Sequence, residues 1–193
     1  MTREGIPAIR RATPGDAMAL ATLARDTFVE TFGHLYRPED LAAFLEKSQS
    51  VAAYSRLLQD PRVAVWVAED ADGTLVGFLN AGPCKLPLPE PQPGAGEIRQ
   101  LYLRSSVQRG GLGTRLLVLG LEWLAAQGHF PLYVGVWSGN SGAQRLYGRF
   151  GFEKIGEDGD RVIFKPVGTW DAAAWIDKVR YHFHRLMNRV HGR

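Results

Sequence analysis

Apolar residues in the first part of the chain recur with the spacing of a short strand followed by helices. Residues 8–12 form a β-prone segment, and the apolar positions after them lie three and four apart, which predicts a helix that stops at Gly33. We expect the inward face of this helix to carry Met18, Leu20, Leu23, Thr27, Phe28 and Phe32. Two shorter helices are predicted next, one starting at Pro38 and one over residues 51–58.

The pattern then changes from helical spacing to strict alternation. Valine and alanine alternate over residues 63–69, which predicts a strand, and the Asp-Ala-Asp-Gly turn leads into a return strand over 74–81. Residues 82–96 contain five prolines, so we expect an extended surface loop there.

The second half of the chain alternates strands with helices. The pattern predicts strands over 98–103, 132–137, 152–155 and 161–164, and helices over 111–127 and 143–150. The leucine-rich helix joins two neighbouring strands, and a right-handed crossover of this kind makes such strands parallel. The fold class is therefore α/β, with a mixed sheet flanked by helices.

A glycine-dense loop, Gln108-Arg109-Gly110-Gly111-Leu112-Gly113, separates the predicted strand 98–103 from the helix that follows. Free backbone N–H groups and the positive end of a helix dipole meet there, which is how proteins bind phosphate. A mononucleotide P-loop needs a lysine, but Gly113 is followed by Thr114 and Arg115. A dinucleotide loop needs an acidic residue about 20 positions on, and none lies between Glu122 and Glu153.

This loop resembles the Gln/Arg-x-x-Gly-x-Gly/Ala loop of the GNAT superfamily of N-acetyltransferases, which holds the pyrophosphate of acetyl coenzyme A. Residues 140–152 resemble a second GNAT pattern, Asn-x-x-Ala-x-x-Phe/Leu-Tyr-x-x-x-Gly-Phe. The similarity covers about residues 8–165. The Thr-Phe steps at 27–28 and 31–32, and the Gly-Val-Trp segment 135–137, are similar to the PaiA-type subgroup, whose members acetylate polyamines or other small amines.

The resemblance implies a GNAT fold of about seven strands, with a splay between the fourth and fifth strands. It also implies acetyl coenzyme A as co-substrate. The residues it assigns to coenzyme binding are Leu101, Tyr102, Leu103, Gln108, Arg109, Gly110, Gly111, Leu112, Gly113, Thr114, Asn140 and Tyr147. In such proteins the pantetheine arm pairs with the fourth strand like an added strand, and a backbone N–H near Leu103 polarises the thioester carbonyl.

Two residues are candidates for proton transfer. Glu97 is the candidate base that takes a proton from the attacking amine, although an exposed glutamate at a strand end is equally ordinary. Tyr147 is the candidate acid for the departing thiolate, and its alternative is a core tyrosine on a helix face. For the acceptor amine we expect contacts from Phe32, His34 and Tyr36, with a solvated loop position as the alternative for His34.

Composition narrows the class of protein. The 193 residues carry a net charge of +3, an excess that suits a polyanionic co-substrate but is too small to indicate nucleic acid. The single cysteine, Cys84, excludes an internal disulfide framework, and no metal cluster is expected. No run approaches the roughly 18 apolar residues of a membrane span. We therefore expect a cytoplasmic protein that has no membrane or nucleic-acid partner and that forms a homodimer, as many GNATs do.

The chain continues past the expected acetyltransferase domain of residues 1–166. Residues 167–193 place apolar side chains, among them Trp170, Trp175, Val179 and Val190, at helical spacing with basic residues between them. This predicts an amphipathic basic helix that packs on its own domain or on a dimer partner. The leading interpretation is an enzyme that acetylates a small primary amine or polyamine. The alternatives are a catalytically silent acyl-coenzyme-A-binding module that regulates a partner through this arm, and a protein N-terminal acetyltransferase.

Overall fold

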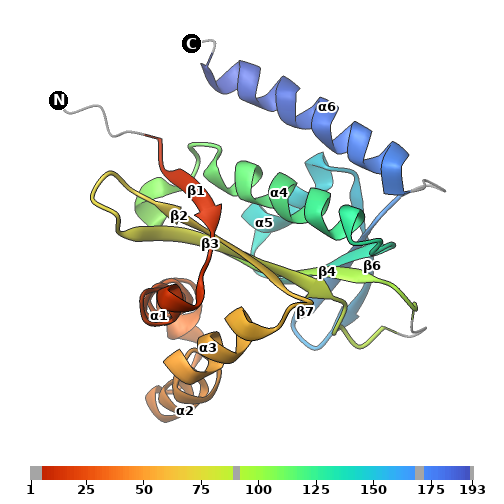
Figure 1. The fold of residues 1–193 in the computed structure, drawn as a ribbon. Coiled ribbons are helices and arrows are strands. Elements are labelled where there is room, and N and C mark those ends of the chain that lie inside the picture. Colours follow the sequence, from red (N-terminus) through yellow and green to blue (C-terminus); the bar gives the residue numbers. More distant parts are fainter. Residues whose placement is uncertain (1–5, 89–91, 168–171, 192–193) are drawn as a thin grey trace. The chain divides into compact units, whose positions relative to one another are not determined.

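The computed structural model describes residues 6–88, 92–167 and 172–191, and seven strands form its sheet in the order β1-β2-β3-β4-β5-β7-β6 (Figure 1). The strands are β1 (Ala8–Arg11), β2 (Ala64–Glu69), β3 (Leu75–Pro83), β4 (Gly96–Leu103), β5 (Leu132–Trp137), β6 (Phe152–Asp158) and β7 (Arg161–Pro166). The longer helices are α1 (Ala17–Phe32), α2 (Pro38–Ser48), α3 (Val51–Gln59), α4 (Leu112–Ala126), α5 (Ser141–Arg149) and α6 (Ala172–His191). The predicted α/β fold class is confirmed.

The chain forms two compact units. Unit 1 comprises Met1–Asn80 and Gln100–Leu116, and unit 2 comprises Ala81–Arg99 and Leu117–Arg193. Strands β3 and β4 and helix α4 contribute residues to both units. Strand β4 pairs with β5 in parallel, as the crossover through α4 predicted.

The core of unit 1 forms where α1 and α3 pack on the strands. Leu20 and Leu23 of α1, Tyr54 of α3 and Phe78 of β3 are buried in one cluster, and α1, α2 and α3 group together in Figure 1. One sequence prediction fails here, because Met18 is 70% exposed. It lies in the first turn of α1, where the inward positions are taken by Ala17, Leu20 and Ala21.

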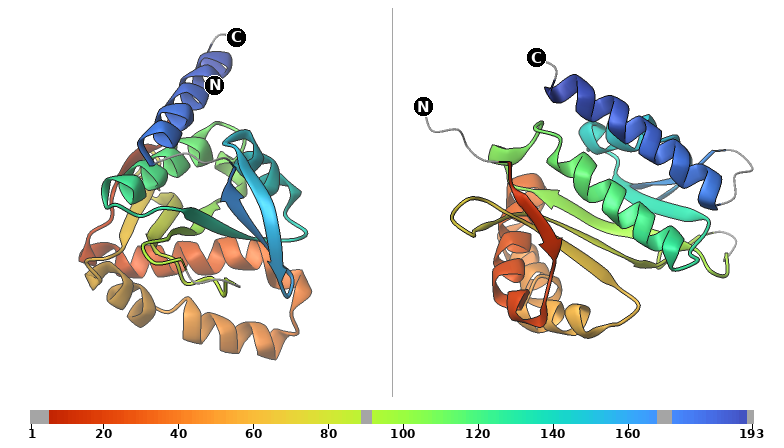
Figure 2. Two further views of the ribbon diagram at one scale, coloured as in Figure 1. Left: turned by 90° about the vertical axis from the view of Figure 1, so that its right-hand side faces the viewer. Right: turned by 45° about the horizontal axis from the view of Figure 1, so that its top comes forward.

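Helix α6 packs on the rest of unit 2 through its first half. Trp175 is fully buried, Ile176 and Val179 are buried beside it, and Arg180 Nε lies 2.7 Å from Glu122 Oε1 of α4. Both views in Figure 2 show α6 running along α4. The amphipathic helix predicted for the C-terminal segment is therefore docked on its own chain. Trp170 lies outside the described residues, as does the side chain of Val190.

The proline-rich segment is less extended than its composition predicts. Leu86 and Ala95 are buried and pack with Tyr133 of β5 and Ile163 of β7, so the two flanks of the segment close over unit 2. The expectation of an extended surface loop was wrong for these flanks, because Leu86, between two prolines, and Ala95, after the last of them, are buried in this cluster.

Candidate active site

The glycine loop of unit 1 adopts the backbone conformation of an anion-binding turn. Arg109 and Gly111 have positive φ values of 67° and 82°, with Gly110 between them. Left-handed residues next to ordinary ones turn successive N–H groups toward one point, a concave arrangement that suits anions. Gln108, Arg109 and Gly110 are exposed, and the Gln108 N–H donates to the Ser105 carbonyl at 3.3 Å.

The start of α4 adds further donors to this turn. The N–H of Arg115 donates to the carbonyl of Gly111 at 3.1 Å, which opens the helical hydrogen-bond series. The N–H groups of Leu112, Gly113 and Thr114 precede that bond and have no carbonyl acceptor within the helix. These three N–H groups lie at the positive end of the helix dipole and form a set of amide donors there.

The end of β4 packs closely on the loop that follows it. A Cβ on Gly113 would lie 3.3 Å from Leu103 Cδ1, and one on Gly77 of β3 would lie 2.4 Å from Leu103 Cδ2. The Gln108 side chain donates to the Leu103 carbonyl at 3.2 Å. Glycines at both sites let the Leu103 side chain fill the space between β3 and the first turn of α4.

The parallel pairing of β4 with β5 is short. Its register runs from Gly96 opposite Leu132 to Ile98 opposite Val134, whereas β4 continues to Leu103 and β5 to Trp137. Leu101, Tyr102 and Leu103, the predicted pantetheine-binding residues, lie in the part of β4 beyond this register and are half-buried. The limited pairing agrees with the splay expected between the fourth and fifth strands.

The predicted acceptor residues of unit 1 belong in part to one aromatic cluster. The ring of Phe32 lies 4.9 Å from Phe28 and 6.5 Å from Tyr102, and the ring of Tyr36 lies 5.8 Å from Phe28. Phe32 is half-buried and Tyr36 is exposed. His34 is exposed in the short turn Gly33–Leu35 and is not part of this cluster.

In unit 2 the second sequence motif forms the turn and helix that were expected from it. Asn140 is the N-cap of α5, and its Oδ1 accepts a hydrogen bond from the Ala143 N–H at 2.9 Å. The side-chain oxygen of Asn140 thus caps the helix, and its NH₂ group is a donor that does not take part in this cap.

Tyr147 of α5 is held by aromatic neighbours and is only 4% exposed. Its ring meets Phe152 edge-on at 5.8 Å, and Phe152 in turn meets Trp175 of α6 at 5.4 Å. The C-terminal helix is therefore linked to the candidate acid through a single intervening ring.

Glu97 lies in β4 of unit 2 and is buried, with 6% of its surface exposed. Its Oε2 accepts a hydrogen bond from the backbone N–H of Lys85 at 2.8 Å. Burial raises the pKa of the Glu97 carboxyl, while the Lys85 N–H and the charges of Arg99 and Arg161 oppose that rise. The alternative interpretation of Glu97 as an exposed strand-end glutamate is thus wrong, because its carboxyl is buried and has a raised pKa.

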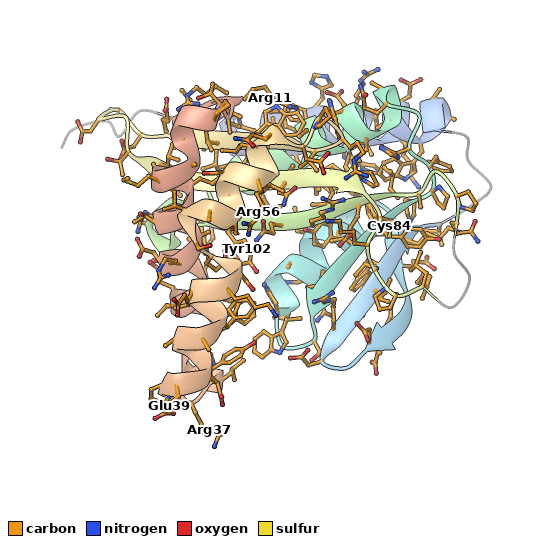
Figure 3. All side chains as sticks on the ribbon, turned by 60° about the horizontal axis from the view of Figure 1, so that its bottom comes forward. Arg11, Arg37, Glu39, Arg56, Cys84 and Tyr102 are labelled. Carbon is orange, nitrogen blue, oxygen red and sulfur yellow. The ribbon has the colours of Figure 1, made fainter. Side chains whose placement is uncertain are left out.

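Sequence reasoning missed a buried polar network in unit 1. Tyr54 Oη donates to Gln49 Oε1 at 2.6 Å, Gln100 Nε2 donates to Tyr54 Oη at 3.3 Å, and Asn80 Nδ2 donates to Gln100 Oε1 at 3.1 Å. Figure 3 labels Tyr102, two residues beyond Gln100, and Arg56 of α3, and it shows the side of unit 1 that carries α1, α2 and α3. An asparagine inside the apolar strand β3 was the signal in the sequence.

No group of three or more His, Cys, Asp or Glu side chains in residues 6–88, 92–167 and 172–191 is placed to hold a metal ion. No helix in the same ranges is long and apolar enough to cross a membrane.

Comparison with known proteins identifies relatives of the chain. The sequence profile of the acetyltransferase (GNAT) family matches residues 19–152. An N-acetyltransferase of Lactobacillus delbrueckii subsp. lactis, itself uncharacterised, is 31% identical over 146 residues, which cover 74% of this chain and 82% of the relative. An uncharacterised N-acetyltransferase of Mycobacterium tuberculosis is 30% identical over 138 residues, covering 72% and 83% of the two chains.

Among solved structures, the chain is similar to the PaiA N-acetyltransferase of Thermoplasma acidophilum, which was crystallised with coenzyme A. The TM-score is 0.71 at 20% sequence identity, and the match covers 84% of this chain and 99% of that one. At this identity the likeness concerns the fold.

Proposed function

Because the chain belongs to the GNAT family of acetyltransferases, we propose that it transfers the acetyl group of acetyl coenzyme A to a small primary amine. The observation that carries this proposal is the loop of unit 1. Its positive φ values at Arg109 and Gly111, together with the three donors at the start of α4, suit a diphosphate. The narrower expectation of a polyamine as acceptor rests on the PaiA resemblance alone.

The residues present fit the coenzyme in two places. Residues 108–113 and the Thr114 hydroxyl would hold its pyrophosphate, and the part of β4 beyond its register with β5, residues 101–103, would pair with its pantetheine arm. When bound, acetyl coenzyme A supplies a thioester whose carbonyl an amine attacks. The backbone N–H of Leu103 or its neighbour would stabilise the charge that develops on that carbonyl oxygen.

Two side chains would move protons. An ammonium group must lose a proton before it can attack, and the raised pKa of the Glu97 carboxyl makes it a stronger base than an exposed glutamate. The Tyr147 hydroxyl would donate a proton to the coenzyme thiolate as it leaves. The close aromatic packing of Tyr147 fixes its ring, which favours a reproducible direction for that donation.

The test combines coenzyme binding with turnover. Calorimetry with coenzyme A should show binding to the wild type and its loss in Gly111→Val, because a β-branched residue cannot adopt a φ of 82° without strain. Gly73→Val is the matched control, since Gly73 has a φ of 78°, open space around it and a place in a hairpin turn outside the loop. Wild-type affinity in Gly111→Val would refute the assignment of the loop.

Turnover is measured as thiol release from acetyl coenzyme A with a panel of small amines, polyamines and peptides with free N-termini. Release with a small amine supports the proposal. Release with peptides alone would identify an N-terminal acetyltransferase, and coenzyme binding without turnover on any amine would identify the silent regulatory module. The docking of Trp175 and Arg180 on unit 2 favours an enzyme over a regulator that works through a free C-terminal arm.

A further inference from the structure

The buried polar network of unit 1 has a direction. Each amide or hydroxyl donates to the next residue, from Asn80 to Gln100, then to Tyr54, and finally to Gln49. Donors that line up in this way polarise one another, so donation by the Asn80 NH₂ makes its own carbonyl oxygen a stronger acceptor. The hydrogen-bonded chain therefore makes Asn80 Oδ1 a stronger hydrogen-bond acceptor than an isolated amide oxygen.

That oxygen has no partner. Asn80 is 4% exposed, and its Oδ1 is a buried side-chain atom without a hydrogen bond in the described part of the protein. Buried polar atoms are nearly always paired, because leaving one unpaired costs about 1–3 kcal/mol. An unpaired atom at the head of an otherwise satisfied chain of bonds indicates that a ligand supplies the missing donor.

The surroundings of Asn80 decide the charge of that ligand. Among the described residues of unit 1, the buried polar side chains are neutral: Thr27, Gln49, Asn80 and Tyr54. Burial also raises the pKa of the Tyr54 hydroxyl, so that it stays protonated and uncharged. The buried carboxylate among the described residues of the protein, Glu97, belongs to unit 2 and is the proposed base for the reacting amine, so a ligand with further ammonium groups would have to desolvate them without another such carboxylate to pair with, which is costly. A neutral N–H donor meets no such penalty.

Aromatic side chains beside the network indicate that the non-amine part of the ligand is aromatic or apolar. Phe78 precedes Asn80 by two residues on β3, and its ring lies 5.7 Å from Tyr102, which follows Gln100 by two residues on β4. Phe32 meets Tyr102 at 6.5 Å. Side chains two apart on a strand share a face and lie about 6–7 Å apart. An aromatic ring against Tyr102 and Phe32 would thus place an amine two carbons away within reach of Asn80.

We propose that Asn80 Oδ1 accepts an N–H of the acceptor amine, and that the acceptor is a monoamine carried on an aromatic or apolar body rather than a polyamine. This inference rests on the proposed function and narrows it to a substrate class. Gln100, Tyr54 and Gln49 act as positioning residues that hold and polarise Asn80. The uncharged network favours the amine in its deprotonated form, which is also its nucleophilic form.

The probe is 2-phenylethylamine, compared with N,N-dimethyl-2-phenylethylamine, which has no N–H in its neutral form. Calorimetry at alkaline pH, in the presence of coenzyme A, measures both dissociation constants. We expect wild type to prefer the primary amine by about tenfold or more, because the tertiary amine leaves Oδ1 unpaired. In Asn80→Leu, which keeps the shape of the side chain, the preference should fall to about one. Spermidine should bind wild type at least tenfold more weakly than 2-phenylethylamine.

Thr27→Val is the matched control, because Thr27 is equally buried and polar but bonds within α1 through the Leu23 carbonyl. It should keep the wild-type preference. A merely structural effect of Asn80→Leu would weaken both probes alike and keep their ratio, and that result would overturn the inference. So would failure of wild type to bind 2-phenylethylamine while coenzyme A still binds. Loss of coenzyme binding by wild type would instead count against the proposed function.

Discussion

The sharpest test of the chemistry replaces the buried carboxyl of Glu97 by an amide. Glu97→Gln keeps the length of the side chain, and the glutamine carbonyl can still accept the 2.8 Å hydrogen bond from the Lys85 N–H. The substitution therefore removes the ability to take up a proton while leaving the local backbone anchored. General bases typically contribute roughly 10²–10⁴-fold to rate, so we expect kcat/KM for the amine to fall by that factor.

Glu97→Gln should lower activity but should not lower the stability of the folded protein at pH 7. Burial raises the pKa of the Glu97 carboxyl in the folded protein, so its favourable contribution is complete below the ordinary pKa of glutamate, about 4.3, and is lost as pH rises through the folded pKa. At neutral pH the ionised carboxylate therefore destabilises the folded protein relative to a neutral side chain. Glu97→Gln should therefore be at least as stable as wild type at pH 7, and this advantage should disappear at about pH 4.

Two measurements decide the case. The first is the pH profile of kcat/KM, in which the acid limb of wild type should be missing from Glu97→Gln. The second is urea unfolding at both pH values. Glu153→Gln, at an exposed position on β6, is the control for losing one carboxylate in unit 2. Wild-type turnover in a stable Glu97→Gln variant would remove Glu97 from the mechanism and leave it as an anchor for the segment around Lys85.

Three further substitutions test other parts of the site. Tyr147→Phe should lower kcat at least tenfold with unchanged affinity for coenzyme A by calorimetry, and unchanged kcat would exclude the hydroxyl as the acid. Trp175→Ala should destabilise the protein by about 3–5 kcal/mol in urea unfolding, because it empties a fully buried site; Tyr181→Ala, at a 64% exposed position of the same helix, should stay within about 0.5 kcal/mol of wild type. Gly77→Ala places a Cβ 2.4 Å from Leu103 Cδ2 and should cost about 1–3 kcal/mol by overpacking; wild-type stability would show that the Leu103 side chain moves aside freely.

Periodicity predicted most of the fold because each element carries its own signal. The leucine-rich helix and the strand 132–137 were located within a residue or two, and the crossover rule gave the parallel β4–β5 pair. Met18 was misplaced because helical spacing alone does not say which apolar residue sits at the solvated first turn. The burial of Leu86 and Ala95 was missed because it depends on Tyr133 and Ile163, which are distant in sequence.

The site was predictable where the backbone carries the chemistry and not where side chains from distant segments combine. Glycine spacing located the loop, whose positive φ at Gly111 agrees with the conformation that an anion-binding turn requires. The network that begins at Asn80 continues through residues of β4, α3 and the C-cap of α2, so no local pattern reveals it. The environment of Glu97 was hidden for the same reason, since its hydrogen-bond donor lies twelve residues away in an irregular segment.

The ring of Trp175 comes from outside residues 19–152, the span that carries the family signature. The C-terminal helix nevertheless packs against Phe152 through Trp175, and Phe152 in turn packs against Tyr147. Evolution can therefore adjust the enzyme from an accessory segment without altering any shared motif. A truncated protein that ends at residue 152 would lose the Trp175 contact together with the helix.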